Sequence, residues 1–538
     1  MLLTLPAAAQ TIEKGAITGN VYDSTGAVVP NASVKVTNVG TGEQRTLTTN
    51  ADGRYLADAL SPGEYTVEIE ASGFSKVLVK EVRVAVGQRF IQDVTLKVAA
   101  AGEVVEVTAD AGPIDRGETR IKTTINNTYI EELPISGRDF RDFAILGATA
   151  DTSPGLRSPV RLQGQQGEYT GLLIDGVDNR NSFFGEWFGS LETKNFTLPQ
   201  DSVQEFQVRD SGLSAELGHA TGGLINVVTK SGTNQWHGSA HWFVQSNSFF
   251  AENALPGVPP PFDTRNQFGG TLGGPIVREK LFFFLAGDLQ EQAGPLGTSF
   301  LQDVSGVAVP ELGIADLSDL EGSTNQRQDL RTALLKLDYQ ITKGTRGTSR
   351  ANYTRNETDN FTGGASQIFV FGAVESNFED FVNEGPVFLQ TLTTVLNPTT
   401  VNEVRFAYSL ERRDRINNGP GPETVITGVG SFGRRFFLPI TSHHKRYQVV
   451  DNFSKTFGKH DLKLGVDLNS NGTNQAFIGF AGGVYSFASL TDFINRRPTN
   501  YRQLFGINGF DAIESGTLDT FWQHERSLYI QDDWKIHP

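Results

Sequence analysis

The sequence predicts an all-β protein whose C-terminal half is an antiparallel β-barrel facing lipid. Glycine (58) and phenylalanine (37) are abundant whereas methionine occurs once, a mix that suits strands and turns better than helices. Between residues 461 and 471 apolar and polar residues alternate, with Leu462, Leu464, Val466 and Leu468 on one face. The predicted strands after residue 235 are joined by connections that are alternately long and short.

Composition and charge narrow the classes of function. The 538 residues contain no cysteine, which excludes disulfides, thiolate metal sites and cysteine nucleophiles within them. The net charge of −15 argues against a nucleic-acid partner, because such binding requires clustered lysine and arginine. No run of about 18 apolar residues occurs, so no membrane-spanning helix is predicted.

The first ten residues have the pattern of the end of a signal peptide. A short apolar stretch leads into Ala7-Ala-Ala9, which fits the small-residue cleavage site of exported proteins, although no basic segment precedes it. We therefore expect export, with residues 1–10 as a signal-peptide remnant.

Residues 11–98 are predicted to form a small β-sandwich. Turn pairs such as Asp52-Gly53 and Pro62-Gly63 separate short alternating segments. Seven strands at this spacing suit a sandwich. They are expected at 16–23, 32–38, 44–49, 54–57, 64–71, 76–82 and 88–98.

This region resembles the carboxypeptidase regulatory-like domain. The resemblance rests on Ile17-Thr-Gly-Asn-Val-Tyr-Asp23, Asn50-Ala-Asp-Gly-Arg-Tyr55 and Leu60-Ser-Pro-Gly-Glu-Tyr65. It covers about 80 residues and implies a module without an active site.

Residues 99–109 are predicted to be a linker that contains one short strand. The run Glu103-Val-Val-Glu-Val-Thr-Ala109 has the composition of a strand that adds to the edge of a partner's sheet. The alternative, which composition alone favours, is that it is the last strand of the sandwich or a connector.

Residues 110–234 are glycine-rich and are predicted to contain both short helices and strands. Apolar stripes predict short helices at 129–134 and 138–146. Strands are expected at 172–177 and 203–209. A further strand is expected within 222–232, where flanking glycines permit close backbone approach.

Ten strands are predicted from residue 235 onward. They lie at 235–246, 264–274, 280–292, 329–342, 347–356, 385–396, 401–412, 445–457, 461–471 and 525–536. Long and short connections alternate between them without a break. A transmembrane barrel has this pattern, with tight turns on one side of the membrane and long loops on the other. The aliphatic side of each hairpin is therefore predicted to face lipid, since a closed barrel pairs every backbone N–H group in hydrocarbon.

The middle of the chain resembles the plug of a TonB-dependent outer-membrane receptor. The motifs appear in that family's order: Leu133-Pro-Ile-Ser-Gly-Arg138, Ile174-Asp-Gly-Val-Asp178, Ser214-Ala-Glu-Leu-Gly218 and Gly222-Gly-Leu-Ile-Asn-Val-Val-Thr-Lys-Ser-Gly232. The resemblance implies an α+β plug at 110–234 and a barrel at 235–538. The stretch from Arg265 to Ile276, followed by Lys280-Leu-Phe-Phe-Phe284, resembles the Oar-like subgroup, which also carries the regulatory-like domain.

The resemblance also implies two sites. The TonB box, the strand given to the periplasmic TonB protein, would consist of Glu103, Val104, Val105, Glu106, Val107 and Thr108. The outer apex of the plug would follow Asp178 and form a ligand platform. Its candidate residues are Asn179, Arg180, Asn181, Phe183, Phe184 and Trp187. Packing of these rings against the barrel wall is the alternative.

Family members have 22 strands, so ten strands make an incomplete barrel and we expect this chain to be a C-terminally truncated fragment. The implied location is the outer membrane of a Gram-negative bacterium, with the N-terminal domain in the periplasm. The implied partners are TonB with its inner-membrane energising proteins, outer-membrane lipid and an extracellular ligand of unknown identity.

No catalytic motif or cofactor site is predicted. His443-His444 lacks further ligands for a metal, and Gly428-Val-Gly-Ser-Phe-Gly433 lies in a long loop without a βαβ context. An enzyme is thus not expected. The alternatives to a transporter are a secreted or surface β-sandwich adhesin or glycan-binding protein, and an outer-membrane receptor without transport.

Overall fold

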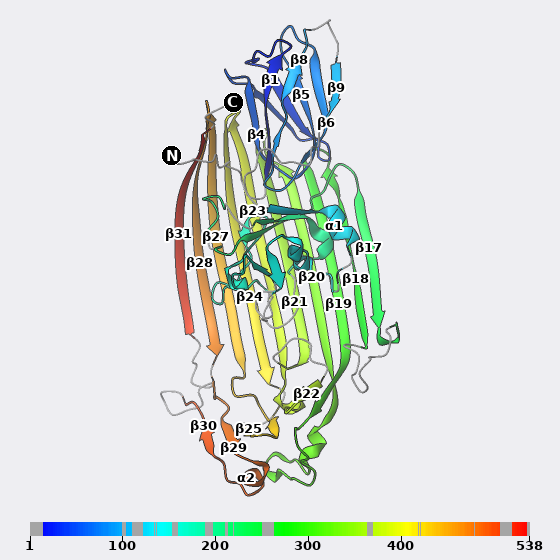
Figure 1. Ribbon diagram of the computed structural model, residues 1–538, viewed down its shortest axis with the longest axis vertical. Helices are drawn as coiled ribbons and strands as arrows, with labels where there is room; N and C mark the ends of the chain where they lie inside the picture. Colours follow the sequence, from blue (N-terminus) through cyan, green and yellow to red (C-terminus); the bar gives the residue numbers. More distant parts are fainter. Residues whose placement is uncertain are drawn as a thin grey trace.

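The computed structural model stacks three regions along its long axis (Figure 1). A small domain lies at one end, a sheet of long strands with short elements against one face fills the middle, and loops with short strands lie at the other end. The described residues are 14–98, 104–109, 122–133, 135, 137–152, 160–188, 197–209, 213–218, 220–249, 263–362, 369–417, 419, 421–477, 479–505 and 519–534.

The N-terminal domain is a β-sandwich, as predicted. One sheet contains β4 (Arg54–Leu60), β1 (Gly15–Asp23), β7 (Arg89–Ile91) and β8 (Val94–Leu96). The other has the order β3-β2-β5-β6-β9, formed by β3 (Gln44–Thr48), β2 (Ser33–Asn38), β5 (Gly63–Glu70), β6 (Lys76–Val84) and β9 (Val104–Thr108). Every second residue of β5 is buried, so the alternating pattern forms the core between the sheets.

The plug is built around a second, five-stranded sheet of order β10-β15-β16-β13-β14. Its strands are β10 (Lys122–Asn126), β15 (Val203–Arg209), β16 (Leu224–Thr229), β13 (Gly171–Ile174) and β14 (Val177–Asp178). The predicted helices occur as α1 (Asn127–Glu132) and a 3₁₀ turn, η1 (Phe140–Leu146). The short strands β11 (Ala150–Thr152) and β12 (Val160–Leu162) pair with each other, beside the 3₁₀ turns η2 (Gly167–Tyr169) and η3 (Gln200–Ser202).

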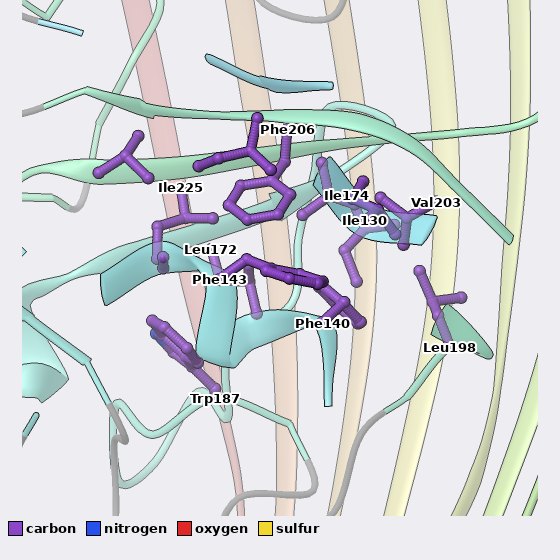
Figure 2. Close-up of a cluster of buried hydrophobic side chains, with 14 of the residues drawn as sticks. Ile130, Phe140, Phe143, Leu172, Ile174, Trp187, Leu198, Val203, Phe206 and Ile225 are labelled. Carbon is purple, nitrogen blue, oxygen red and sulfur yellow. The ribbon is translucent and has the colours of Figure 1, made fainter. Parts of the chain in front are cut away.

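Large apolar side chains form the core of the plug, which continues onto four buried side chains of the long-strand sheet. Figure 2 shows Phe140, Phe143 and Trp187 gathered below Phe206 and Leu172. All five are at most 3% exposed. The plug is therefore a packed body rather than a set of loops.

Ten long strands form one antiparallel sheet in chain order, and all ten predicted strands are found. They are β17 (His237–Ser246), β18 (Thr264–Val277), β19 (Leu281–Ser299), β20 (Gly322–Gln340), β21 (Thr345–Phe361), β23 (Glu379–Asn397), β24 (Thr400–Asn417), β27 (Ile440–Phe457), β28 (His460–Phe477) and β31 (Asp519–Trp534). Within the described strands the sheet is open, ending at β17 and β31. This agrees with the predicted incomplete barrel.

The connections define two ends of the sheet. Short turns join β18 to β19, β20 to β21, β23 to β24 and β27 to β28, and the N-terminal domain lies at this short-turn end (Figure 1). Many strands run further than predicted toward the opposite, long-loop end. There the loops carry their own short elements: η4 (Asn247–Phe249), η5 (Pro310–Leu312), η6 (Leu317–Leu320), β22 (Phe369–Phe371), η7 (Glu375–Asn377), β25 (Glu423–Ile426), β26 (Gly430–Phe432), β29 (Val484–Phe487), α2 (Leu490–Ile494) and β30 (Asn500–Arg502).

The alternation in β28 separates an outer from an inner face. Leu464 and Leu468 are 38% and 42% exposed on the outer face, whereas Lys463 and Asn469 are 2% and 7% exposed on the inner face. A soluble sandwich would bury the aliphatic side and expose the polar side. The alternative of a soluble β-sandwich for this half of the chain is therefore wrong.

Aromatic rings border the aliphatic band on the outer face. Toward the long-loop end the ring of Tyr447 lies 5.1 Å from that of Tyr408 and 6.3 Å from that of Trp522. Toward the short-turn end Phe457 and Trp534 are 47% and 54% exposed. About ten residues separate the two rows along β27, which is roughly 25 Å along the barrel axis at a tilt of about 40°. This matches the ~25 Å apolar band between the aromatic girdles of outer-membrane barrels.

Asp451 interrupts this aliphatic band. Its carboxylate accepts a hydrogen bond of 2.6 Å from the side-chain amide of Asn402 on the neighbouring strand, which supplies a polar partner on the outer face.

Among the described residues, no helix is both long enough and apolar enough to cross a bilayer.

Candidate functional site

Buried ion pairs fasten the plug to the inner face of the sheet. The Asp175 carboxylate lies 2.7 Å from the guanidinium of Arg350 on β21 and 3.9 Å from the ammonium of Lys336 on β20. The backbone N–H and the hydroxyl of Thr229 donate to the same carboxylate at 2.9 and 2.8 Å. Burial alone would raise the pKa of Asp175, but Lys336 and Arg350 outweigh it and hold that pKa well below its ordinary value.

A second set of buried polar contacts lies nearer the long-loop end. The Arg413 guanidinium of β24 lies 3.1 Å from the carboxylate of Glu186 in the plug. The amide of Asn181 donates to the carboxylate of Glu411 at 2.6 Å. All four side chains are at most 3% exposed.

The kind of contact between the plug and the wall determines whether the plug can move. Its interior is apolar, and part of that core continues onto Phe284 and Leu334 of the wall, whereas the contacts just described join other parts of the plug to the wall through charges and hydrogen bonds. Water can replace the partners of such groups when they separate, at far lower cost than exposing an apolar core. The arrangement thus allows the plug to change its position against the wall without unfolding completely.

Two of the predicted apex residues, Phe183 and Phe184, form an aromatic pair beneath the long loops. Phe183 is 47% exposed, and its ring lies 4.7 Å from that of Phe184 and 5.9 Å from that of Phe521 on β31. The Arg413 guanidinium lies 5.0 Å above the Phe184 ring. Phe183 offers a partly open face, while Phe184 packs against the wall, which was the alternative interpretation.

The other predicted apex residues are structural in this arrangement. Asn179 and Asn181 are buried and hydrogen-bonded within the plug or to the wall, and Arg180 forms an ion pair of 2.9 Å with Asp178. Trp187 is only 1% exposed, and its indole N–H donates to the carbonyl of Thr170 at 3.0 Å. The Trp187 ring is thus enclosed within the plug in this structure, where it acts as a core residue.

An arginine–aromatic group above the apex escaped the sequence analysis. The guanidinium groups of Arg415 and Arg435 lie 5.1 and 5.4 Å from the ring of Phe437. Arg415 also pairs with the buried carboxylate of Glu379, and Arg435 lies 3.8 Å from it. The stretch Arg434-Arg-Phe-Phe437 was the available sequence signal, because adjacent basic and aromatic residues favour cation–π contacts.

The long loops pack on one another beyond this group. Their shared apolar cluster draws on segments far apart in the chain, and the sheet β26-β25-β29-β30 adds backbone pairing between two of the loops. The buried members are Phe300, Val304, Val309, Leu317, Val374, Ile426, Val429, Phe432 and Phe487. The loops therefore form a structured cover over the long-loop end.

The predicted TonB box lies at the other end of the molecule. Val104–Thr108 form strand β9, which pairs in parallel with β6 of the sandwich. Glu103, the first residue of the predicted box, lies outside the described residues. The structure thus contains a short strand at this position and places it at the edge of the sandwich, in agreement with the alternative that composition favoured.

The N-terminal domain is tied to the short-turn end of the wall by ion pairs. The Asp461 carboxylate of β28 lies 2.7 Å from Arg54 and 3.3 Å from Arg89. Glu43 pairs with Arg346 of β21. All five side chains are less than a third exposed.

A cavity of about 490 Å³ lies between the N-terminal domain, the plug and the wall. Its lining includes Glu43, Glu205, Lys336 and Arg346, so both signs of charge face it. The Glu205 carboxylate accepts a hydrogen bond from the backbone N–H of Val86, which joins plug to sandwich. Burial raises the pKa of Glu205 to about 7.

Comparison with known proteins matches two of these parts, the N-terminal domain and the sheet of long strands, to family models. Residues 16–97 match the family model of the carboxypeptidase regulatory-like domain. Residues 228–304 and 304–538 match the model of an outer membrane β-barrel domain. The chain is 29% identical over 290 residues to the TonB-dependent transporter Oar of Myxococcus xanthus, which covers 51% of this chain and 26% of that protein. It is 30% identical over 128 residues to the ferrienterobactin receptor of Escherichia coli (strain K12), which covers 22% of this chain and 17% of that receptor.

Solved structures share the fold. The siderophore receptor PirA from Acinetobacter baumannii aligns with a TM-score of 0.52 and 16% identity, covering 78% of this chain and 55% of that one. The outer membrane transporter YddB from Escherichia coli aligns with a TM-score of 0.53 and 12% identity, covering 77% and 54%. The chain thus spans about a quarter of the length of the transporter Oar and just over half of these solved chains.

Proposed function

Because this chain belongs to the outer membrane β-barrel domain family and has TonB-dependent receptors among its relatives, we propose that it is the gated part of a ligand importer. It is a protein of the Gram-negative outer membrane and not an enzyme. An extracellular ligand binds at the long-loop end. A TonB protein in the periplasm then engages β9 and transmits energy from inner-membrane proteins to the plug.

The buried polar contacts between the plug and the wall are the main support for this proposal. Asp175 with Arg350, and Glu186 with Arg413, join plug to wall across buried interfaces. A permanent stopper would be held best by apolar packing, which is not weakened by water. Buried charged contacts of this kind, alongside the apolar contact with Phe284 and Leu334 of the wall, suit a plug that is displaced and then returns.

The direction of transport follows from the connections. Outer-membrane barrels carry their short turns on the periplasmic side and their long loops outside. We assign the short-turn end, with the N-terminal domain and β9, to the periplasm. Phe183 and the partly exposed Arg435 then lie on the side of the incoming ligand.

The proposed ligand is an anionic, ring-containing molecule such as a ferric siderophore. Phe183 supplies an open ring at the apex, and Arg415 and Arg435 lie among aromatic rings above it. Two relatives support this class by name, the ferrienterobactin receptor of Escherichia coli and a probable siderophore receptor of Acinetobacter baumannii. Ferric enterobactin is therefore the probe of choice.

Binding of the purified periplasmic domain of TonB to the full-length protein in detergent micelles tests the coupling step. Consecutive residues of a strand point their N–H groups to opposite edges, so Val105→Pro with Glu106→Pro removes one donor at each edge of β9. We expect at least a tenfold loss of affinity. Val105→Thr with Glu106→Gln keeps both N–H groups and serves as the control, which should bind like the unaltered protein.

Iron uptake tests the ligand. Cells that make the full-length protein should accumulate iron from ferric enterobactin only when TonB is present. Uptake that is equal with and without TonB would contradict an energised importer. Normal TonB binding without enterobactin uptake would contradict the siderophore class alone.

A further inference from the structure

Strand β9 is paired along one of its two backbone edges with the sandwich strand β6. It runs parallel to β6 through five residue pairs, from Lys76 opposite Val104 to Lys80 opposite Thr108. It is the last strand of its sheet, and β6 is its one neighbour within the described part of the chain. The backbone edge that faces β6 is therefore occupied.

Only weak side-chain contacts attach β9 to the sandwich. Val105 packs partly against the core, and the Ala109 N–H donates to the carbonyl of Lys80 at 2.9 Å. Val104 and Val107 remain 50% and 42% exposed. The ion pair between Lys80 and Glu106, at 2.7 Å, joins two side chains that are about half exposed, and such pairs contribute little.

The sandwich itself is anchored far more firmly. Asp461 of the wall pairs with Arg54 and Arg89, and all three side chains are at most 11% exposed. As long as β9 stays paired with β6, a pull on β9 passes into the sandwich and from there into the wall. The pull reaches the plug through the chain only after β9 has left β6.

We propose that β6 is an intramolecular docking strand that withholds β9 from TonB, so that the sandwich and TonB compete for the same strand. This inference rests on the proposed function, which assigns β9 to TonB. It gives the regulatory-like domain a role: it keeps the coupling strand docked until TonB displaces β6.

A disulfide between the two strands tests the competition. Leu78 lies opposite Glu106 in the register, and adjacent strands have the spacing that a disulfide requires. We expect the oxidised Leu78→Cys, Glu106→Cys variant of the full-length protein to bind the TonB periplasmic domain at least tenfold more weakly than its reduced form. The control is Thr37→Cys with Thr66→Cys, which joins β2 to β5 in the same sheet without touching β9. Its oxidation should leave binding unchanged.

A charge reversal provides an independent test. Lys80→Glu places two carboxylates together at the β6–β9 contact, so β9 should leave β6 more readily and TonB affinity should rise severalfold. Lys76→Glu is the matched control on the same strand, because the Lys76 ammonium pairs with Glu68 of β5 at 2.8 Å instead. It should leave TonB affinity within twofold.

The outcomes separate the two proposals. If proline in β9 abolishes TonB binding while the oxidised Leu78–Glu106 crosslink does not, TonB adds to the free edge of β9 and the competition is disproved. If proline in β9 has no effect on TonB binding, the assignment of β9 to TonB is wrong, and the competition is disproved with it.

Discussion

Asp175 of the plug and Arg350 of strand β21 lie 2.7 Å apart, and neither side chain is more than 10% exposed. Removing one member of such a pair leaves an uncompensated buried charge, which costs about 3–5 kcal/mol. We expect Arg350→Met to destabilise the plug by about 3 kcal/mol, since Lys336 still faces Asp175. Denaturant titration of the full-length protein in micelles measures this loss of stability, with hydrogen exchange in Leu224–Thr229 as the signal that reports on the plug.

A pair on the same sheet whose arginine is exposed is the control for this prediction. Arg327 pairs with Asp329 at 2.8 Å, but its side chain is 53% exposed. Arg327→Met should therefore cost less than about 1 kcal/mol. Equal effects of the two arginine substitutions would show that the Asp175 pair does not seat the plug.

Ionisation of buried Glu205, at the contact between plug and sandwich, should destabilise the protein as pH rises. Burial raises the pKa of Glu205 from 4.5 to about 7, so the folded state binds the proton more tightly than the unfolded state. The associated stability is fully present below about pH 4.5 and is lost as pH rises through 7. Its size is on the order of 3 kcal/mol, at 1.36 kcal/mol per pKa unit.

Glu205→Gln removes this titration but keeps an oxygen acceptor for the Val86 N–H. The variant should match the unaltered protein near pH 4.5 and exceed it in thermal stability at pH 8. Hydrogen exchange around Val86 reports the contact directly. Glu70→Gln, at an exposed position of the sandwich, is the control and should leave the pH profile unchanged.

The outer face of β23 tests the lipid assignment. By strand register Leu392 lies near the middle of the aliphatic band and Leu396 near its short-turn edge, and both side chains are exposed on the same face. Leu392→Arg should destabilise the protein in bilayers by about 2–4 kcal/mol, and Leu396→Arg by about 0–1 kcal/mol. Folding titrations into lipid vesicles measure both, and equal costs would contradict a membrane centred on this band.

Substitution by alanine should destabilise the protein far more at Trp187 than at Phe183, although both residues come from the predicted apex. Trp187 is buried in the plug, so Trp187→Ala should cost about 3–5 kcal/mol of plug stability. Phe183 is nearly half exposed, so Phe183→Ala should cost about 1 kcal/mol or less. Thermal unfolding in micelles distinguishes the two, and a stable Trp187→Ala variant would disprove its core role.

Local patterns predicted the elements well. The ten strands from β17 to β31 follow from alternation with a period of two, which is clearest in β28, whereas β19 and β20 also point apolar side chains such as Phe284 and Leu334 inward. The sandwich strands follow from turn pairs such as Asp52-Gly53. Strand ends were less accurate: β20 begins at Gly322, seven residues before the predicted strand, because hairpin pairing with Thr298 extends it beyond the alternating segment.

The sequence by itself determined the β class, the order of the strands and the division of each strand between lipid and lumen, since these depend on residues close together in the chain. The tertiary structure decided which distant groups meet: Asp175 with Arg350, Asp461 with Arg54, and β9 with β6. It also placed Trp187 in the core, although neighbouring Phe183 is open. The physical reason is that charge pairing and burial depend on positions in space, and no period along the chain records which strand will lie opposite.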